Sequence, residues 1–317
     1  MRHLLSVADL SREDIERVMS VADSFAEVAD RDIKKVPTLR GRTVVNLFYE
    51  ASTRTSSSFE LAAKRLSADV VNVRSAGSSV DKGESLKDTV ATLSAYDPAA
   101  IVIRSPSAGA AALVARYTTA AVVNAGDGKH EHPSQALLDV FTLKRKVGSL
   151  DGLKIWIVGD VLHSRVARSN ALAFGRMGAH VTICGPPTLI PRDAGEALGC
   201  EVSYDLDRLA EADVVYALRM QRERMADALV PSLREYVTRY QINGRRLEPR
   251  QLLMHPGPVN RGVELAAEVI DSPQALIVEQ VASGLVVRMA ILYELVSGGG
   301  GDGVAREASV TGAEQPA

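Results

Sequence analysis

The sequence has little cysteine, no excess of either charge and no long apolar run, and each absence narrows what the protein can be. Only two of its 317 residues are cysteines, so neither a disulfide framework nor a cysteine-based zinc site is expected, and a reduced cytoplasm is the predicted setting. With 37 basic and 39 acidic residues, the net charge is −2, which argues against a nucleic-acid-binding protein. No run of about 18 apolar residues occurs, so no membrane-spanning helix is predicted.

Three common catalytic fingerprints are also missing. Gly128-Lys129 lacks the leading glycine of a nucleotide-binding P-loop, and no Gly-x-Ser-x-Gly elbow occurs. Gly159-Asp160 follows a predicted strand but lacks the glycines of a dinucleotide site, and the next predicted strand, ending at Cys184, is not followed by an acidic residue. These absences disfavour an NAD-dependent dehydrogenase, the rival suggested by an α/β pattern.

The chain alternates short apolar segments with amphipathic ones, which is the pattern of parallel α/β sheets. The first run has predicted strands over 43–49, 70–73, 100–103 and 121–124 and predicted helices over 11–22, 59–66, 85–96, 108–117 and 135–147. The second run has predicted strands over 153–158, 180–184, 214–218 and 252–254 and predicted helices over 164–177, 206–210 and 284–296. Two Rossmann-like α/β domains with parallel sheets are therefore expected, with a boundary near residues 130–150.

The segment from Glu50 to Thr55 joins the first strand to a helix and is the strongest candidate for an anion site. Helix N-termini present unpaired N–H groups and partial positive charge, and arginine can bond a phosphate through two N–H groups. Capping would explain one of the hydroxyls of Ser52, Thr53 and Thr55, but it does not explain Arg54 between two threonines. We therefore expect this segment to bind a phosphorylated small substrate.

Other candidates follow predicted strands, where ligands gather in open α/β sheets. Arg104 either binds an anion there or is an ordinary surface arginine, and Arg165 is suited to a carboxylate. Arg219 begins a charged run to Arg224, a pattern that is also typical of a solvated helix face. The rigid turn over 255–258 either directs its carbonyl oxygens at an amino group or only bends the chain.

The histidine pair His130 and His132 precedes the helix that starts near Gln135. A metal site is disfavoured because the remaining histidines are scattered and no cysteine cluster accompanies them. We expect His132 and Gln135 to act together, since histidine can donate a hydrogen bond to a carbonyl oxygen that gains negative charge. A turn histidine with a capping role is the alternative.

Together these segments resemble the aspartate/ornithine carbamoyltransferase family, from about residue 3 to residue 296. Each motif is weak alone, but all of them in one order are hard to obtain by chance. The motifs are Phe48-Tyr49-Glu50-Ala51-Ser52-Thr53-Arg54-Thr55, Lys82-Gly83-Glu84-Ser85, His132-Pro133-Ser134-Gln135, Gly159-Asp160 with Arg165, Arg219-Met220-Gln221 and His255-Pro256-Gly257-Pro258.

The resemblance implies a carbamoyl phosphate-binding domain over 1–135 and an aspartate-binding domain over 136–283. A C-terminal helix over about 284–297 is expected to return to the first domain. Residues 298–317 begin with a glycine run and lack apolar periodicity, so we expect a disordered tail there.

The resemblance also implies a role for each motif. The expected carbamoyl phosphate ligands are Ser52, Thr53, Arg54, Thr55, Arg104, His132, Gln135, Gly257 and Pro258, of which Arg54, Thr55, Arg104, His132 and Gln135 are catalytic. The expected aspartate ligands are Arg165, Arg219, Gln221 and Lys82. Lys82, with Ser78 or Ser79, is expected to reach the site from a neighbouring subunit of a homotrimer. Glu50 and Arg224 are expected to hold the domains closed.

The implied reaction transfers the carbamoyl group of carbamoyl phosphate to the α-amine of L-aspartate, an early step of de novo pyrimidine biosynthesis. It needs no metal, organic cofactor or covalent intermediate. Ornithine is the nearest alternative acceptor, but the ornithine branch typically carries a His-Cys-Leu-Pro turn and a Ser-Met-Gly run, which this sequence lacks. Arg219 and Gln221 suit a second carboxylate better than an ammonium group. A non-catalytic anion-binding subunit would not need these acceptor-side residues, and whether regulatory or other pathway chains join the trimer stays open.

Overall fold

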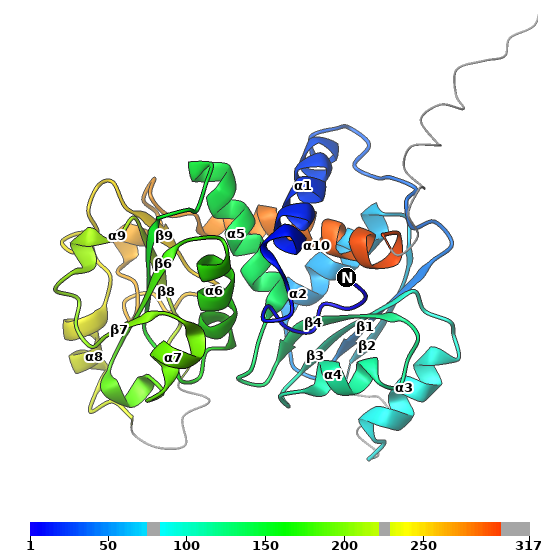
Figure 1. Ribbon diagram of the computed structural model, residues 1–317, viewed down its shortest axis with the longest axis horizontal. Coiled ribbons are helices and arrows are strands. Elements are labelled where there is room, and N and C mark those ends of the chain that lie inside the picture. Colours follow the sequence, from blue (N-terminus) through cyan, green and yellow to red (C-terminus); the bar gives the residue numbers. More distant parts are fainter. Residues whose placement is uncertain (75–82, 222–228, 299–317) are drawn as a thin grey trace, which may run out of the picture.

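The structure is a computed structural model that describes residues 1–74, 83–221 and 229–298 (Figure 1). The predicted roles of Ser78, Ser79, Lys82 and Arg224 fall outside these residues, as does the predicted tail from residue 299 onward. In the part of the chain that is described, no helix combines the length and hydropathy needed to span a bilayer.

The first sheet has four parallel strands in the order β2-β1-β3-β4. They are β1 (Thr43–Phe48), β2 (Asp69–Arg74), β3 (Ala100–Ser105) and β4 (Ala121–Asp127). Because side chains alternate along a strand, Val44 and Phe48 pack on one face while Val45 and Leu47 pack on the other. Helix α2 (Thr53–Arg65) covers the first face, and α3 (Leu86–Ser94) and α4 (Ala110–Ala115) cover the second (Figure 1).

The second sheet has five parallel strands in the order β7-β6-β5-β8-β9. They are β5 (Lys154–Val158), β6 (His180–Cys184), β7 (Glu201–Ser203), β8 (Val214–Ala217) and β9 (Leu252–Met254). Its helices are α6 (Arg165–Arg176), α7 (Ala194–Leu198), α8 (Leu233–Tyr240) and α9 (Ala267–Ile270), with 3-10 turns η2 (Pro187–Leu189) and η3 (Leu209–Glu211). Ile155 and Ile157 of β5 face the core that includes α6, whereas Trp156 and Val158 belong to a separate cluster.

Three further helices join the two sheets into one molecule. Helix α5 (Pro133–Val147) leads from the first sheet to the second, and α10 (Ile277–Val296) leads back and packs against α1 (Arg12–Ala29), α2 and α5 (Figure 1). The return of α10 is held in part by an ion pair between Arg17 and Glu294 at 2.9 Å and by edge-to-face packing of Phe25 on Tyr293. The predicted fold, two parallel α/β sheets with a returning C-terminal helix, is confirmed.

The sequence-based elements differ from the structure in their ends and in several short elements of the second half of the chain. Helix α10 begins at Ile277, several residues before the predicted start at 284. The prediction missed its first turns because the buried polar residues Gln280 and Ser283 interrupt their apolar periodicity. The helix predicted over 206–210 is the single 3-10 turn η3, and β7, α7, α8 and α9 were not predicted. The domain limits at residues 135 and 283 stay a prediction.

Candidate active site

The candidate site lies where both sheets reverse their strand order. In the first sheet this point is between β1 and β3, and in the second it is between β5 and β8. Loops at the carboxyl ends of such strands leave a crevice for ligands. A cavity of about 1040 Å³ opens there, and residues from both sheets line it.

Every predicted site residue within the described chain lines this cavity. They are Glu50, Ser52, Thr53, Arg54, Thr55, Arg104, His132, Gln135, Arg165, Arg219, Gln221, Gly257 and Pro258. Lys129 and Ser164 also line the cavity and were not predicted as ligands. The only sequence feature that could have indicated Lys129 is its position between Gly128 and the histidine pair. The cavity thus collects four arginines and a lysine from five separate segments that are far apart in the sequence.

The N-terminus of α2 forms one wall. Ser52 is the N-cap and its hydroxyl accepts a hydrogen bond from the Thr55 N–H at 3.3 Å, so the capping interpretation holds for this one hydroxyl. Thr55 is buried, whereas Arg54 is exposed to the cavity and donates from Nη1 to the Pro256 carbonyl oxygen at 2.5 Å. This contact links the first domain to the turn after β9.

Glu50, just after β1, binds arginines of both domains. Its Oε1 is 2.8 Å from Arg104 Nη2 and 2.7 Å from Arg165 Nη2, and its Oε2 accepts from Arg165 Nη1 at 3.0 Å. Burial acts to raise the pKa of Glu50, but the bonds and charges of Arg165 and Arg104 outweigh it and hold this pKa below its ordinary value. An ionised Glu50 therefore bridges a candidate phosphate ligand and a candidate carboxylate ligand.

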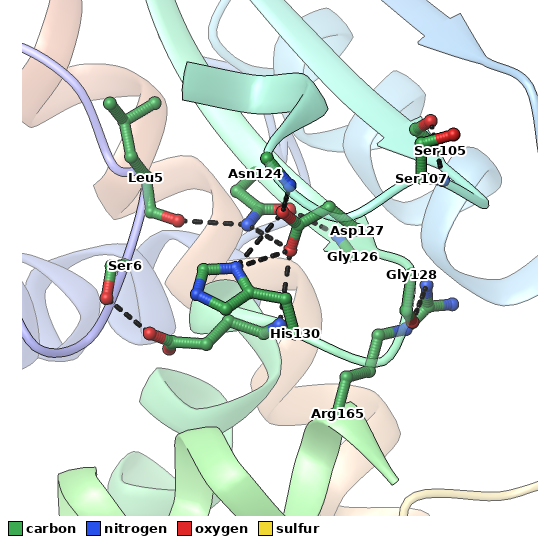
Figure 2. A network of polar contacts seen from close by, with 12 residues as sticks. Leu5, Ser6, Ser105, Ser107, Asn124, Gly126, Asp127, Gly128, His130 and Arg165 are labelled. Atoms are coloured by element: carbon green, nitrogen blue, oxygen red, sulfur yellow. Dashed lines mark hydrogen bonds and ion pairs between the residues drawn. The ribbon is translucent and has the colours of Figure 1, made fainter. Parts of the chain in front are cut away.

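Asp127 organises the turn after β4 (Figure 2). Its carboxylate accepts from the side chain of Asn124 and from the backbone N–H groups of Gly109 and Glu131, and it contacts His130 Nδ1. His130 is therefore a partner within this turn. The turn presents the Gly128 carbonyl oxygen to Arg165 Nη1 at 3.2 Å.

His132 and Gln135 stand at the start of α5, as predicted, with His132 as the N-cap residue. Burial, and then the charges of Arg104, Arg165 and Arg288, lower the pKa of His132 well below its ordinary value. Its imidazole is therefore neutral near pH 7. Its backbone N–H donates to the Ser169 hydroxyl at 2.8 Å, and that hydroxyl donates to Glu131, which also accepts from the Val7 N–H.

The second domain holds its cavity residues through two buried histidine–carboxylate pairs. Asp160 accepts from the backbone N–H of Gln221 at 3.2 Å and contacts His163 Nδ1 at 2.9 Å, while Gln221 Nε2 donates to the His163 carbonyl oxygen. Behind the turn after β9, Glu264 Oε1 lies 3.2 Å from His255 Nε2. His255 Nδ1 in turn accepts from the Gly257 N–H at 2.8 Å.

The sequence analysis placed His255 in a rigid turn and His163 among scattered histidines, but it predicted neither histidine–carboxylate pair. Their partners Asp160 and Glu264 are close to them in the chain, which was the available signal. Among the residues that the structure describes, no group of three histidine, cysteine or acidic side chains is arranged to hold a metal ion.

Two family models together match most of the chain. The first is described as "Aspartate/ornithine carbamoyltransferase, carbamoyl-P binding domain" and matches residues 2–145. The second is described as "Aspartate/ornithine carbamoyltransferase, Asp/Orn binding domain" and matches residues 151–295.

Curated relatives are similar over nearly their whole length. The aspartate carbamoyltransferase catalytic subunit of Salinispora arenicola is 57% identical over 304 residues, which cover 94% of this chain and 99% of the relative. The protein of the same name from Acidothermus cellulolyticus is 56% identical over 303 residues, with 94% of each chain covered.

Solved structures agree. Aspartate transcarbamoylase from Trypanosoma cruzi in complex with carbamoyl phosphate and aspartate has a TM-score of 0.84 at 31% identity, covering 93% of this chain and 97% of the other. The catalytic subunit of aspartate transcarbamoylase from M. jannaschii has a TM-score of 0.83 at 37% identity, covering 95% and 100%.

Proposed function

The chain belongs to the aspartate/ornithine carbamoyltransferase family, and from that membership we propose that it transfers the carbamoyl group of carbamoyl phosphate to the α-amine of L-aspartate. The products are N-carbamoyl-L-aspartate and phosphate. The enzyme is thus a carbamoyltransferase, and the reaction stands early in pyrimidine synthesis.

The observation that carries the proposal is the charge of the shared cavity. Arg54, Arg104, Arg165 and Arg219 line it together with Lys129, and Glu50 is its acidic member among the described lining residues. Carbamoyl phosphate and aspartate each bring about two negative charges. A well-placed charge-assisted hydrogen bond contributes roughly 1.5–3 kcal/mol, so several arginines can hold both anions in one orientation.

Carbamoyl phosphate is bound in the first domain. Arg54 and Arg104 bind its phosphate with the hydroxyls of Ser52, Thr53 and Thr55, next to the partial positive charge of the α2 N-terminus. Its carbamoyl end is held by Thr55, Arg104, His132 and Gln135. Support comes from the common cavity that these side chains line, although α2, β3 and α5 supply them separately.

The reaction begins when the neutral α-amine of aspartate attacks the carbamoyl carbon. A C–N bond forms, and the carbonyl oxygen becomes an oxyanion that Thr55, Arg104 and His132 stabilise. Neutral His132 donates from Nε2 when the Ser134 hydroxyl, 3.3 Å from Nδ1, donates to the other nitrogen. The C–O bond to phosphate then breaks, and the leaving phosphate takes the proton released by the amine.

Aspartate is bound by the second domain. Arg165, Arg219 and Gln221 contact its carboxylates, and the backbone oxygens near Gly257 and Pro258 face its amine. Holding both substrates in line contributes roughly 7 kcal/mol or more to lowering the barrier. The arginines favour aspartate over ornithine, because ornithine would bring an ammonium group to the same wall. Phosphate released with aspartate but not with ornithine, in a colorimetric assay, tests the proposal.

One prediction concerns Gly126, whose φ of +115° is a conformation that side chains rarely adopt. A Cβ added there would lie 2.9 Å from Cζ of Arg165, so Gly126→Ala must displace the guanidinium. We expect KM for aspartate to rise about ten- to hundred-fold, the effect of one charge-assisted bond. Gly41→Ala is the matched control, since Gly41 also has positive φ but nothing within 4 Å of the added atom. Equal KM changes in the two variants would contradict the role of Arg165.

We propose that the active enzyme is a homotrimer with shared sites, in which a neighbouring subunit supplies Lys82 and either Ser78 or Ser79. Support comes from the exposed edge of the first domain. Strand β2 lies at the end of its sheet with Val71 exposed, and Leu61 of α2 is exposed nearby in the sequence. Native mass spectrometry should give three times the 33.9 kDa chain mass.

Sharing of sites gives a sharper prediction. Arg54→Ala and Lys82→Ala are each expected to be inactive, but trimers re-formed from an equal mixture should regain activity. About a quarter of the sites will pair an intact Arg54 with an intact Lys82 from the next chain, if chains assort at random. Each variant dissociated and re-formed alone is the control. If the mixture stays as inactive as these controls, Lys82 is not supplied across an interface.

Two further parts of the proposal concern setting and motion. The protein acts in the cytoplasm, in keeping with its two free cysteines, and carries no metal or organic cofactor. Glu50 and Arg224 hold the domains closed over bound substrates. The bonds of Glu50 to Arg104 and Arg165 support its part in this motion.

A further inference from the structure

A buried carboxylate behind the cavity accepts hydrogen bonds from four elements. Asp139 lies one turn after Gln135 on α5 and is fully buried. Its Oδ1 accepts from Gln135 Nε2 at 3.0 Å and from Gln280 Nε2 of α10 at 2.7 Å. Its Oδ2 accepts from Asn170 Nδ2 of α6 at 2.9 Å and from the Tyr216 hydroxyl of β8 at 2.7 Å.

A carboxylate can only accept, so Asp139 fixes which end of each amide faces it. The amide nitrogen of Gln135 is directed at Asp139, which leaves its oxygen for the cavity that Gln135 lines. In Gln280 the nitrogen is likewise engaged, and the oxygen accepts from the His255 N–H at 3.0 Å. His255 then holds Gly257 through its Nδ1.

Asp139 therefore reaches two cavity walls by separate routes. One route runs directly to Gln135, and the other runs through Gln280 and His255 to the turn at Gly257. Burial raises the pKa of Asp139 to about 6, although the hydrogen bonds from Gln280, Asn170, Tyr216 and Gln135 act to lower it. The carboxylate is thus ionised near pH 7 and able to accept all four bonds.

We infer that Asp139 is a positioning residue for carbamoyl transfer, which turns the Gln135 oxygen toward the amide N–H of the carbamoyl group and fixes the turn that faces the reacting amine. The inference rests on the proposed function and deepens it. It assigns to Asp139 the discrimination between carbamoyl phosphate and free phosphate, because only the former presents an amide to Gln135.

A purely structural role would have a different signature. The bonds to Asn170 and Tyr216 tie α5 to the second domain, so loss of Asp139 could simply loosen the molecule. Such loosening would weaken the binding of every ligand to a similar extent. Loss of positioning would weaken the binding of carbamoyl phosphate alone. Inorganic phosphate lacks the carbamoyl end and would bind as before.

The experiment compares Asp139→Asn with wild type in one steady-state assay of N-carbamoyl-L-aspartate. It measures KM for carbamoyl phosphate and the inhibition constant of inorganic phosphate. We expect KM to rise about tenfold, equivalent to about 1.4 kcal/mol, with the phosphate constant changed less than about twofold. Tyr216→Phe, which removes a donor from Oδ2 only, is the matched control and should leave the ratio of the two constants unchanged.

A double variant tests the route. Because Gln135→Ala removes the group being oriented, adding Asp139→Asn to it should change the ratio of constants less than about twofold. Should Asp139→Asn not fold, Gln280→Leu tests the second route, with kcat expected to fall about tenfold and the phosphate constant unchanged.

Each result separates the inference from the proposed function. An unchanged ratio in Asp139→Asn, or an unchanged kcat in Gln280→Leu, would overturn the positioning role while the wild-type activity stands. A wild-type protein that forms no carbamoyl aspartate would instead overturn the proposed function itself.

Discussion

Arg54→Ala is expected to lower kcat for carbamoyl transfer about a thousandfold or more without unfolding the chain. Arg54 stands at the N-terminus of α2, faces the cavity and bridges to the turn after β9 through the Pro256 carbonyl oxygen. In the proposed reaction it binds the phosphate that gains charge as the C–O bond breaks. Loss of one such preorganised donor typically costs about 10²–10³ in rate, and Arg54 also holds the substrate.

The folded state should tolerate this change. Arg54 is exposed, so its removal leaves no cavity in the core, and the midpoint of thermal unfolding should stay close to that of wild type. Arg31→Ala removes another exposed arginine far from the site in the sequence and should retain full activity. A folded Arg54→Ala protein that keeps its kcat would exclude Arg54 as the phosphate ligand.

Arg165→Ala is expected to lower kcat/KM for aspartate by about 10²–10³. The side chain is buried and has two tasks in the proposal, binding a carboxylate of aspartate and pairing with Glu50. Each lost charge-assisted bond contributes roughly 1.5–3 kcal/mol, so the loss of two, even at the lower value of about 3 kcal/mol in all, already reaches this range. Kinetics with varied aspartate at saturating carbamoyl phosphate measures the effect.

Glu50→Gln separates these two tasks. It removes the charge that pairs with Arg165 while the guanidinium remains available for aspartate. We expect a smaller loss of kcat/KM than in Arg165→Ala, together with a reduced closed fraction in small-angle scattering with a bisubstrate analogue. If both variants lose the same activity, Arg165 acts only as the partner of Glu50 and contacts no substrate.

The residues that line the front of the cavity could be picked out from the sequence, for a physical reason. Side chains that contact a ligand in a parallel α/β fold follow the carboxyl ends of strands, and strand ends are marked by the change from an apolar run to polar residues. Glu50, Arg104 and Arg219 were found in this way. Capping was expected to explain one hydroxyl of this segment, and the structure shows that Ser52 makes the capping bond.

The support behind the site could not be predicted. Asp139, Gln280 and Tyr216 meet from α5, α10 and β8, and nothing local in the sequence indicates which buried polar groups will pair. The same is true of Glu131, which joins the N-terminal segment to Ser169 on α6. Gln280 in particular interrupts the apolar pattern of α10. Its polar side chain, which bonds Asp139, is therefore also the reason that the start of the helix was not predicted.

The most direct test of the central claim identifies the carbamoylated product when both acceptors compete. Wild-type protein is mixed with ¹³C-labelled carbamoyl phosphate and equal concentrations of L-aspartate and L-ornithine, and the products are identified by NMR and mass spectrometry. The proposal predicts labelled N-carbamoyl-L-aspartate, with citrulline at the level of the protein-free control. Labelled citrulline as the main product would contradict the assignment of Arg165, Arg219 and Gln221 to an acceptor carboxylate.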